Sequence, residues 1–341
     1  MTSSHRALLL LRLLFLQLLF RPSSQFGATT TVTVDSSSPS LISQQKLIHT
    51  APLSGSWSDA KLSLRNPNCC VVSISGLDHH LSTLQTYFCG EDAPSDIDLR
   101  IRVRCDNTNR AREDCSRIYT AIMDPQSNPS QQPEEQDSNN PCILALQELA
   151  QGICSLADGQ LQSSVTDVHM RVVCASHYKA IDPPFHTDKC PLRGYVTLTG
   201  PGTEYMETTC KPWEYVALRT LGVEGLAATN RDKVQNLKMA NELEFIVMKG
   251  DYYDASFPEG RQKQQQLQQL LQERSIMNNK KIWSRSDACV HRSPPGNKAT
   301  IKRVILSLDL ADGGDDQEWE ERGRKRNWRV GMTQRKSHLV S

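Results

Sequence analysis

The order of apolar and polar residues predicts helices in the first half of the chain. Apolar side chains recur at helical spacing over residues 81–87, 111–123 and 142–154, and Pro141 opens the last of these segments. Between the first two, strict alternation over residues 97–104 predicts a half-exposed strand, because neighbouring strand residues point to opposite faces. Its apolar face holds Ile97, Leu99, Ile101 and Val103, and its polar face holds Asp98, Arg100, Arg102 and Arg104.

From residue 165 onward the pattern predicts short strands separated by turns, with almost no long helix. The expected strands cover residues 165–174, 193–199, 243–249, 287–293 and 301–310, and the last two are expected to pair and to close the domain. Short strands of this kind are typical of double-sheet folds. We therefore predict an α+β, mainly β fold: a double-stranded β-helix (jelly-roll or cupin-like) core with the N-terminal helices packed outside.

Polar segments set the limits of one predicted domain over residues 67–312. Residues 27–66 are rich in Ser and Thr and predict a disordered spacer. Two polar segments inside the domain, 124–141 and 260–274, predict insertions. After Ala311 the chain is strongly acidic and then basic, so residues 313–341 predict a solvated, disordered tail.

Residues 1–26 predict a targeting peptide that is removed before the protein acts. Leu and Phe dominate from Ala7 to Phe20, three arginines are spaced through the segment, and the first acidic residue is Asp35. The spaced arginines and the absence of acidic residues favour an organelle transit peptide for a mitochondrion or plastid. A basic start followed by a Leu-rich run also fits a secretory signal peptide, which is the alternative. The apolar run is too short and too interrupted for a membrane span, so no stable span is expected in the mature form.

Composition excludes several classes of protein. The 341-residue chain has a net charge of +1, with 39 basic and 38 acidic side chains, so no global charge favours nucleic acid. Its eleven cysteines include no CxxC pair, which argues against a zinc ribbon or finger. Reduced thiols are expected, since a disulfide scaffold would require secretion. The adjacent pairs His79-His80 and Cys69-Cys70 are poor chelates on a strand, where neighbours face opposite ways.

One short motif combines two metal-ligand types. His186 and Asp188 lie two residues apart in FHTDKC, so on an extended segment they point to the same side. An imidazole and a carboxylate are two members of the 2-His-1-carboxylate triad that binds non-haem Fe(II). His291, in a later strand-like segment, is the candidate third ligand. The alternatives are structural: His291 as a satisfied histidine at a corner, and Asp188 as a cap or turn residue.

Two arginines are candidate cofactor-binding residues. Arg303 lies on the strand after His291, and if its face lines the core, a buried guanidinium there favours a bidentate carboxylate partner. In 2-oxoglutarate oxygenases that partner is the distal carboxylate of the cosubstrate. The alternative is an outer ion pair with Asp309 or Glu244. Arg193 is a candidate for binding an acidic substrate group, with a structural ion pair equally open. Thr203 and Glu204 in the following Gly-Pro-Gly turn either support the metal ligands or simply form the turn.

The second half of the chain resembles an uncharacterised, bacterial-type family of unknown function. The matching motifs are Phe185–Asp188, Leu192-Arg193, Gly200–Glu204, Lys249-Gly250 and His291–Pro295. The resemblance covers about residues 165–312, more loosely back to about residue 68, and by itself implies no activity. The order His-x-Asp, strands, His, Arg is also similar, more distantly, to the 2-oxoglutarate/Fe(II) oxygenase superfamily.

Two functional hypotheses follow. The first is an Fe(II)/2-oxoglutarate-dependent oxygenase (a hydroxylase) of unknown substrate, small molecule or protein, with iron on His186, Asp188 and His291 and the cosubstrate on Arg303. No individual catalytic residue is assigned. The second is a non-catalytic metal-binding jelly-roll protein for metal handling, in which the same ligands hold Zn²⁺ instead of Fe(II).

Overall fold

The structure is a computed structural model, and it describes residues 54–90, 96–123, 139–157, 167–175, 184–251, 253, 287–294 and 302–311. The predicted targeting peptide, the insertion at 260–274 and the charged tail lie outside these residues, as does most of the insertion at 124–141.

Six helices and ten strands are described. The helices are α2 (Trp57–Leu64), α3 (Asp78–Cys89), α4 (Thr108–Met123), α5 (Pro141–Ala157), α6 (Pro212–Thr229) and α7 (Arg231–Val234). The strands are β1 (Ser54–Gly55), β2 (Val71–Ile74), β3 (Ile97–Arg104), β4 (Asp167–Ala175), β5 (Leu192–Thr199), β6 (Glu204–Met206), β7 (Leu237–Met239), β8 (Phe245–Lys249), β9 (His291–Arg292) and β10 (Arg303–Leu310). They form a seven-stranded sheet in the order β1-β2-β8-β5-β10-β4-β3 and a three-stranded sheet in the order β7-β6-β9.

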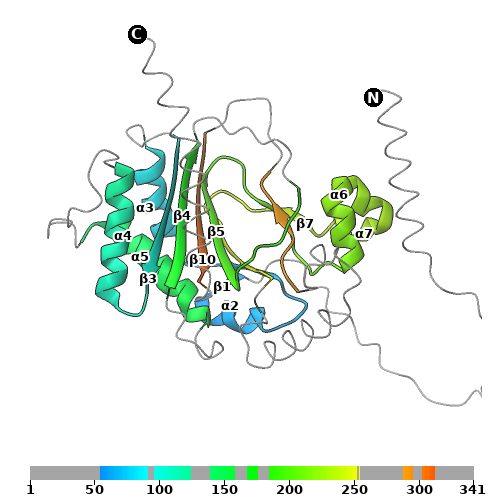
Figure 1. The fold of residues 1–341 in the computed structure, drawn as a ribbon, viewed down its shortest axis with the longest axis horizontal. Helices are drawn as coiled ribbons and strands as arrows, with labels where there is room; N and C mark the ends of the chain where they lie inside the picture. The colour runs from blue at the N-terminus through cyan, green and yellow to red at the C-terminus, as the bar shows by residue number, and fades with distance from the viewer. Residues whose placement is uncertain are drawn as a thin grey trace, which may run out of the picture. The chain divides into compact units, whose positions relative to one another are not determined.

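The main hydrophobic core lies between the large sheet and helices α2 to α5. Figure 1 shows α3, α4 and α5 together on one side of the sheet. The apolar residues predicted for one face of β3 do pack against this core, and the alternate residues of β4, β5, β8 and β10 join them. Except for the short parallel pair β1-β2, all strand pairs are antiparallel. The prediction of a mixed helix and antiparallel-sheet fold is confirmed, and the jelly-roll assignment stays a prediction.

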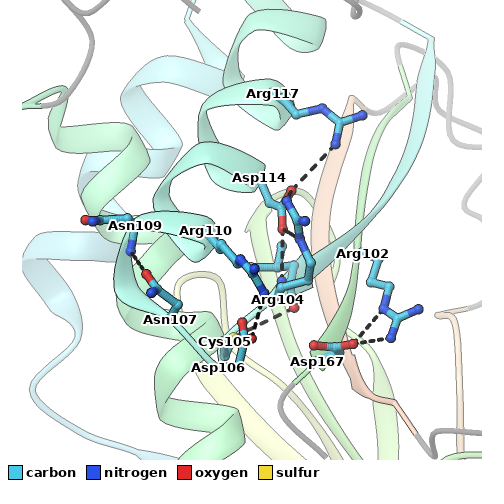
Figure 2. Close-up of polar contacts among 11 residues, drawn as sticks. Arg102, Arg104, Cys105, Asp106, Asn107, Asn109, Arg110, Asp114, Arg117 and Asp167 are labelled. Atoms are coloured by element: carbon cyan, nitrogen blue, oxygen red, sulfur yellow. Dashed lines mark hydrogen bonds and ion pairs between the residues drawn. The ribbon is translucent and has the colours of Figure 1, made fainter. Parts of the chain in front are cut away.

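A side-chain cap and ion pairs fix α4 against the sheet (Figure 2). The Oδ1 atom of Asn107 accepts from the backbone N–H of Asn109, at 2.8 Å, where α4 begins, as expected for an N-cap residue. On the next turn of α4, buried Asp114 accepts from both the backbone N–H and the guanidinium of Arg104, at 2.9–3.0 Å. The polar edge of β3 is thereby joined to α4, which covers its other face.

The opposite face of the large sheet is covered in part by the small sheet. A second apolar cluster lies between them, and it includes Tyr195 of β5, Ile246 and Met248 of β8, Tyr205 of β6 and Cys289. The far side of the small sheet carries a third cluster that it shares with α6, and Figure 1 shows α6 and α7 next to β7 on that side. The space between the two sheets is where the predicted ligand residues lie.

Three sequence-based predictions are wrong. Helix α2 lies within residues 27–66, which we expected to be a disordered spacer; it is ordered because the ring of Trp57 packs edge-on against Phe245, at 5.8 Å between ring centroids. Helix α6 contradicts the expectation that helices are confined to the N-terminal half. The two last strands do not pair with each other: β9 pairs with β6 in the small sheet, whereas β10 lies between β4 and β5 in the large one.

Candidate metal centre

The backbone brings His186 and His291 together. The two residues form an isolated antiparallel bridge and exchange both N–H···O=C hydrogen bonds, each at 2.9 Å. Directly paired residues of antiparallel strands point their side chains to the same face. The rings accordingly lie with centroids 4.5 Å apart. His291 also pairs with Tyr205 of β6, so both imidazoles belong to the inner face of the small sheet.

Asp188 completes the cluster from the same loop as His186. Its Oδ2 atom lies 3.0 Å from Nε2 of His291, and its Oδ1 atom lies 3.8 Å from Nε2 of His186. All three ligand atoms lie within 4.8 Å of one another. Among the described residues, these three are the histidine, cysteine or carboxylate side chains that lie close enough together to hold one metal ion. Asp188 and His291 are buried, whereas the His186 side chain is 44% exposed.

The hydrogen bonds of the two rings fix which nitrogen faces the centre. Nδ1 of His186 lies 3.1 Å from the carbonyl of Pro184, and Nδ1 of His291 lies 3.2 Å from the carbonyl of Cys289. A carbonyl oxygen only accepts, so Nδ1 of each ring carries the hydrogen. In the neutral form of each ring, the Nε2 lone pair then faces Asp188. Metal-bound histidines are usually oriented in this way, by donating their second N–H to a carbonyl.

The residues fit a divalent cation. In the described part of the chain Oδ2 of Asp188 is a buried oxygen with no hydrogen-bond donor. Buried carboxylate oxygens are normally paired, and leaving one unpaired is costly. A cation between this oxygen and the two Nε2 lone pairs would satisfy all three. Two imidazoles and one carboxylate are also the donor set of non-haem Fe(II) sites, and the same donors bind Zn²⁺.

Arg193 of β5 holds the other oxygen of Asp188. Its Nη1 donates to Asp188 Oδ1 at 2.6 Å, while Nε and Nη2 donate to the two oxygens of Asp309 on β10 at 2.5 and 2.7 Å. Burial acts to raise the pKa of the Asp188 carboxyl, but the Arg193 guanidinium beside it is the largest opposing influence, and that pKa lies well below its usual range. Asp188 is therefore ionised, as a metal ligand requires.

The loop that carries the ligands is attached to the end of β8. The N–H of Asp251 donates to the carbonyl of Asp188 at 2.7 Å, and the N–H of Gly250 donates to the carbonyl of Pro191 at 3.0 Å. A Cβ atom on Gly250 would lie 2.0 Å from the carbonyl oxygen of Cys190. Only glycine allows this close approach, so the Lys249-Gly250 turn supports the loop that carries Asp188.

Comparison with known sequences identifies the family. A sequence model described as "Protein of unknown function (DUF1826)" matches residues 100–309, more than half of the chain. The chain belongs to this family. The predicted resemblance to a family of unknown function is thereby confirmed. The DUF1826 region contains the three candidate ligands and both arginines.

Solved structures that match the chain at low sequence identity include dioxygenases. One is the rice dioxygenase for auxin oxidation, with 12% sequence identity and a TM-score of 0.39 over 78% of this chain and 85% of that one. A second is the 2-oxoglutarate complex of dioxygenase for auxin oxidation 1 from Arabidopsis thaliana, with 11% identity and a TM-score of 0.39 over 75% and 89%. A third, from Shewanella oneidensis, is described as a "Putative oxygenase", with 12% identity and a TM-score of 0.36 over 80% and 94%. No curated protein sequence matches the chain.

Arg303 lies on the inner face of the large sheet and is buried. Its Nε donates to the carbonyl of Pro201 at 2.9 Å, and its Nη2 donates to the hydroxyl of Tyr195 at 2.7 Å, with Thr203 Oγ1 at 3.5 Å. The expected inward orientation is therefore present. Asp309, the alternative ion-pair partner, is instead bound by Arg193.

The remaining candidate residues lie elsewhere. Glu204 accepts from Arg292 at 2.6 Å, and Arg292 stacks over Phe185 of the third cluster, which places this pair on the far side of the small sheet. His79 and His80 lie at the start of α3. All eleven cysteines are free thiols. No helix among the described residues is long and apolar enough to cross a bilayer.

Two residues of the site were not predicted from the sequence. Asp309 was considered only as a partner of Arg303, and no role was predicted for Tyr195. Both lie on the inward face of their strand, and the register places Asp309 opposite Arg193 and Ser307 opposite Tyr195. The alternation of each strand shows which residues face inward, but the pairing of Arg193 with Asp309 depends on the order of strands in the sheet.

The histidine cluster predicts how stability depends on pH. Partial burial and the neighbouring His291 ring lower the pKa of His186 from 6.5 to about 4. Between these two values the unfolded chain binds a proton that the folded chain does not. We therefore expect the free energy of unfolding of the metal-free protein to fall as the pH falls from about 6.5 to about 4. Urea unfolding at pH 7, 5.5 and 4.5 measures the fall.

The matched variant is His186→Gln, which has no titrating ring at this position. Its free energy of unfolding should fall less over the same pH interval. An equal fall in both proteins would show that other groups cause it.

Proposed function

We propose that the chain is an Fe(II)/2-oxoglutarate-dependent oxygenase. The observation that carries the proposal is the convergence of two Nε2 lone pairs and one unpaired, buried carboxylate oxygen at a single point. His186, Asp188 and His291 would hold the ion. Such an ion, together with 2-oxoglutarate and dioxygen, supplies an oxidant that hydroxylates a bound substrate.

The fold that fits this proposal is a double-stranded β-helix. The large sheet would supply one wall of the core and the small sheet the other. The paired segments of His186 and His291 extend the small sheet beyond β9, so the ligands would lie at one end of the space between the walls. All three protein ligands would then bind one side of the metal ion, which leaves its other side open for small molecules.

Arg303 is the residue that we assign to the cosubstrate. The Arg303 guanidinium contacts Thr203. Two residues further along the chain, Tyr205 pairs with His291. Two strand residues correspond to about 7 Å. A five-carbon dicarboxylate can span a gap of this order, with one end at the metal and the other at Arg303. The hydroxyl of Tyr195 would join the guanidinium in binding the distal carboxylate.

The charges of the site agree with an anionic cosubstrate. Asp188, Arg193 and Asp309 together carry a formal charge of −1, since one guanidinium lies between two carboxylates. A divalent ion changes this to +1, and Arg303 adds a further positive charge. A dicarboxylate with two negative charges would therefore leave the buried site neutral, which is the least costly arrangement away from water.

Turnover of 2-oxoglutarate without substrate tests the proposal. We expect the purified chain with Fe(II) and dioxygen to convert 2-oxoglutarate slowly to succinate, measured by mass spectrometry. In Arg303→Ala the apparent KM for 2-oxoglutarate should rise by about 30-fold or more, because loss of a buried charged hydrogen-bonding partner costs about 2–5 kcal/mol. Arg292→Ala is the matched control, because Arg292 is also buried and ion-paired but lies on the far side of the small sheet.

The second hypothesis, a non-catalytic metal-handling protein, predicts another outcome. Tight binding of Zn²⁺ or Fe(II) without any succinate, and with metal affinity unaffected in Arg303→Ala, would support it and contradict the oxygenase. Delivery to an organelle remains our proposal for the first 26 residues, and fusion of these residues to a fluorescent protein tests it.

A further inference from the structure

Arg193 makes contacts that a substrate-binding arginine would not make. Three of its nitrogen atoms donate to carboxylates of the protein itself, two to Asp309 and one to Asp188. The pair with Asp309 is bidentate and joins β5 to β10 at directly opposite positions. A bidentate pair fixes the plane of the guanidinium. The third nitrogen is then held at a fixed place and in a fixed direction.

That third nitrogen decides which oxygen of Asp188 faces the histidines. Oδ1 is bound by Arg193 Nη1 at 2.6 Å, and Oδ2 is left 3.0 Å from Nε2 of His291 without a donor. Rotation of the carboxylate would break the bond to Arg193. The guanidinium therefore selects a single oxygen for the metal.

We propose that Arg193, held by Asp309, is a positioning residue that makes Asp188 a one-oxygen metal ligand. This inference rests on the metal site of the proposed function but not on catalysis. It replaces the substrate-binding role that the sequence suggested for Arg193. It also gives Asp309 a role, since without that carboxylate the guanidinium would have only one partner to orient it.

The positive charge of Arg193 and its orienting effect on Asp188 lead to opposite predictions for the metal affinity of a variant that lacks the guanidinium. A positive charge beside a cation site weakens binding, so charge alone predicts tighter metal binding once Arg193 is removed. Orientation predicts weaker binding, because the carboxylate becomes free to rotate or to bind through both oxygens. Loss of a residue that orients a ligand typically weakens metal binding by about 10–100-fold. The sign of the change therefore separates the two effects.

The experiment is anaerobic titration of the full chain with Co²⁺, without 2-oxoglutarate, followed by visible absorption. We expect Arg193→Gln to bind Co²⁺ about 10–100-fold more weakly than wild type and with altered absorption bands. Arg193→Lys should recover part of the loss, because an ammonium reaches one carboxylate. Asp309→Asn should weaken binding less than Arg193→Gln does, and adding it to Arg193→Gln should cause little further change, because both act through one contact.

Arg171→Gln is the matched control. Arg171 also forms a bidentate pair across two strands of the large sheet, with Asp98 at 2.7 Å, but contacts no candidate ligand in the described structure. Its Co²⁺ affinity and absorption bands should equal those of wild type. If Arg193→Gln does not fold by circular dichroism, Arg193→Lys and Asp309→Asn decide the question.

Each result has a definite meaning. Wild-type affinity, or tighter binding, in Arg193→Gln would overturn the positioning role, as would unchanged affinity in both of the milder variants. Equal weakening in Arg171→Gln would also overturn it, because the effect would then be a general loss of sheet stability. Absence of Co²⁺ binding in wild type would overturn the metal site itself and the proposed function with it.

Discussion

Replacement of Asp188 by Ala should abolish metal binding. Asp188 supplies the carboxylate of the ligand set, and its Oδ2 atom is the buried oxygen that lacks a donor. Without it two neutral imidazoles remain, which bind a divalent ion weakly and without charge compensation. The loss should exceed the roughly 10–100-fold effect of removing a residue that only orients a ligand. Titration with Co²⁺ and with Mn²⁺, the latter followed by electron paramagnetic resonance, measures it.

Asp98→Ala provides the control for this experiment. Asp98 also accepts a bidentate pair from an arginine of the large sheet, but its partner is Arg171. Its removal should lower stability and leave metal affinity as in wild type. His291→Ala should behave like Asp188→Ala, because its ring is buried and places the ligand atom Nε2 3.0 Å from Asp188 Oδ2. Wild-type affinity in either ligand variant would contradict the site.

Replacement of Gly250 by Ala should damage both the site and the fold. The new Cβ would lie 2.0 Å from the carbonyl oxygen of Cys190 and 2.8 Å from that of Asp188. These atoms are backbone, so the loop from His186 to Cys190 must move away from the end of β8. We expect a loss of stability near the upper end of the roughly 1–3 kcal/mol that overpacking costs. Co²⁺ affinity should also fall, because Asp188 moves with the loop.

Gly76→Ala distinguishes this effect from general destabilisation. Gly76 has a φ of +78° and open space around its Cα, in the turn before α3. Alanine there costs backbone strain of about 1 kcal/mol and should leave Co²⁺ affinity unchanged. Thermal unfolding and Co²⁺ titration of both variants make the comparison. Equal affinity in Gly250→Ala and wild type would show that the turn does not support the ligand loop.

The sequence allowed prediction of features that depend on local periodicity. Alternation along β3 correctly assigned its core-facing and polar faces, because strand geometry requires it. The grouping of His186 with Asp188 followed from the same rule. The choice of His291 as their neighbour required a fold hypothesis as well, and the backbone pairing of the two histidines agrees with it.

Features that depend on tertiary context were missed. Helix α6 breaks at Gly222, with a φ of +67°, and its buried residues do not form one regular stripe, so helical periodicity is weak there. It begins instead with a buried contact, in which Glu214 accepts from the N–H of Lys211 at 2.8 Å. Helix α2 carried a readable signal, Ser56 followed by Asp59, which form a capping box. We gave more weight to the Ser- and Thr-rich composition of residues 27–66 than to this capping signal.

The hydrogen-bonded pair of His186 and His291 has a consequence for how the protein folds. The two residues are joined by a chain segment that includes β5, β6, α6 and β8, so an ion bound between them closes a very long loop. The cost of closing a loop increases only slowly with its length. A ligand that binds only the native state stabilises it by an amount that grows with the logarithm of its concentration over its dissociation constant. Metal supply would therefore set how firmly β9 is held against the segment of His186, and shortage of the ion would loosen that end of the small sheet first.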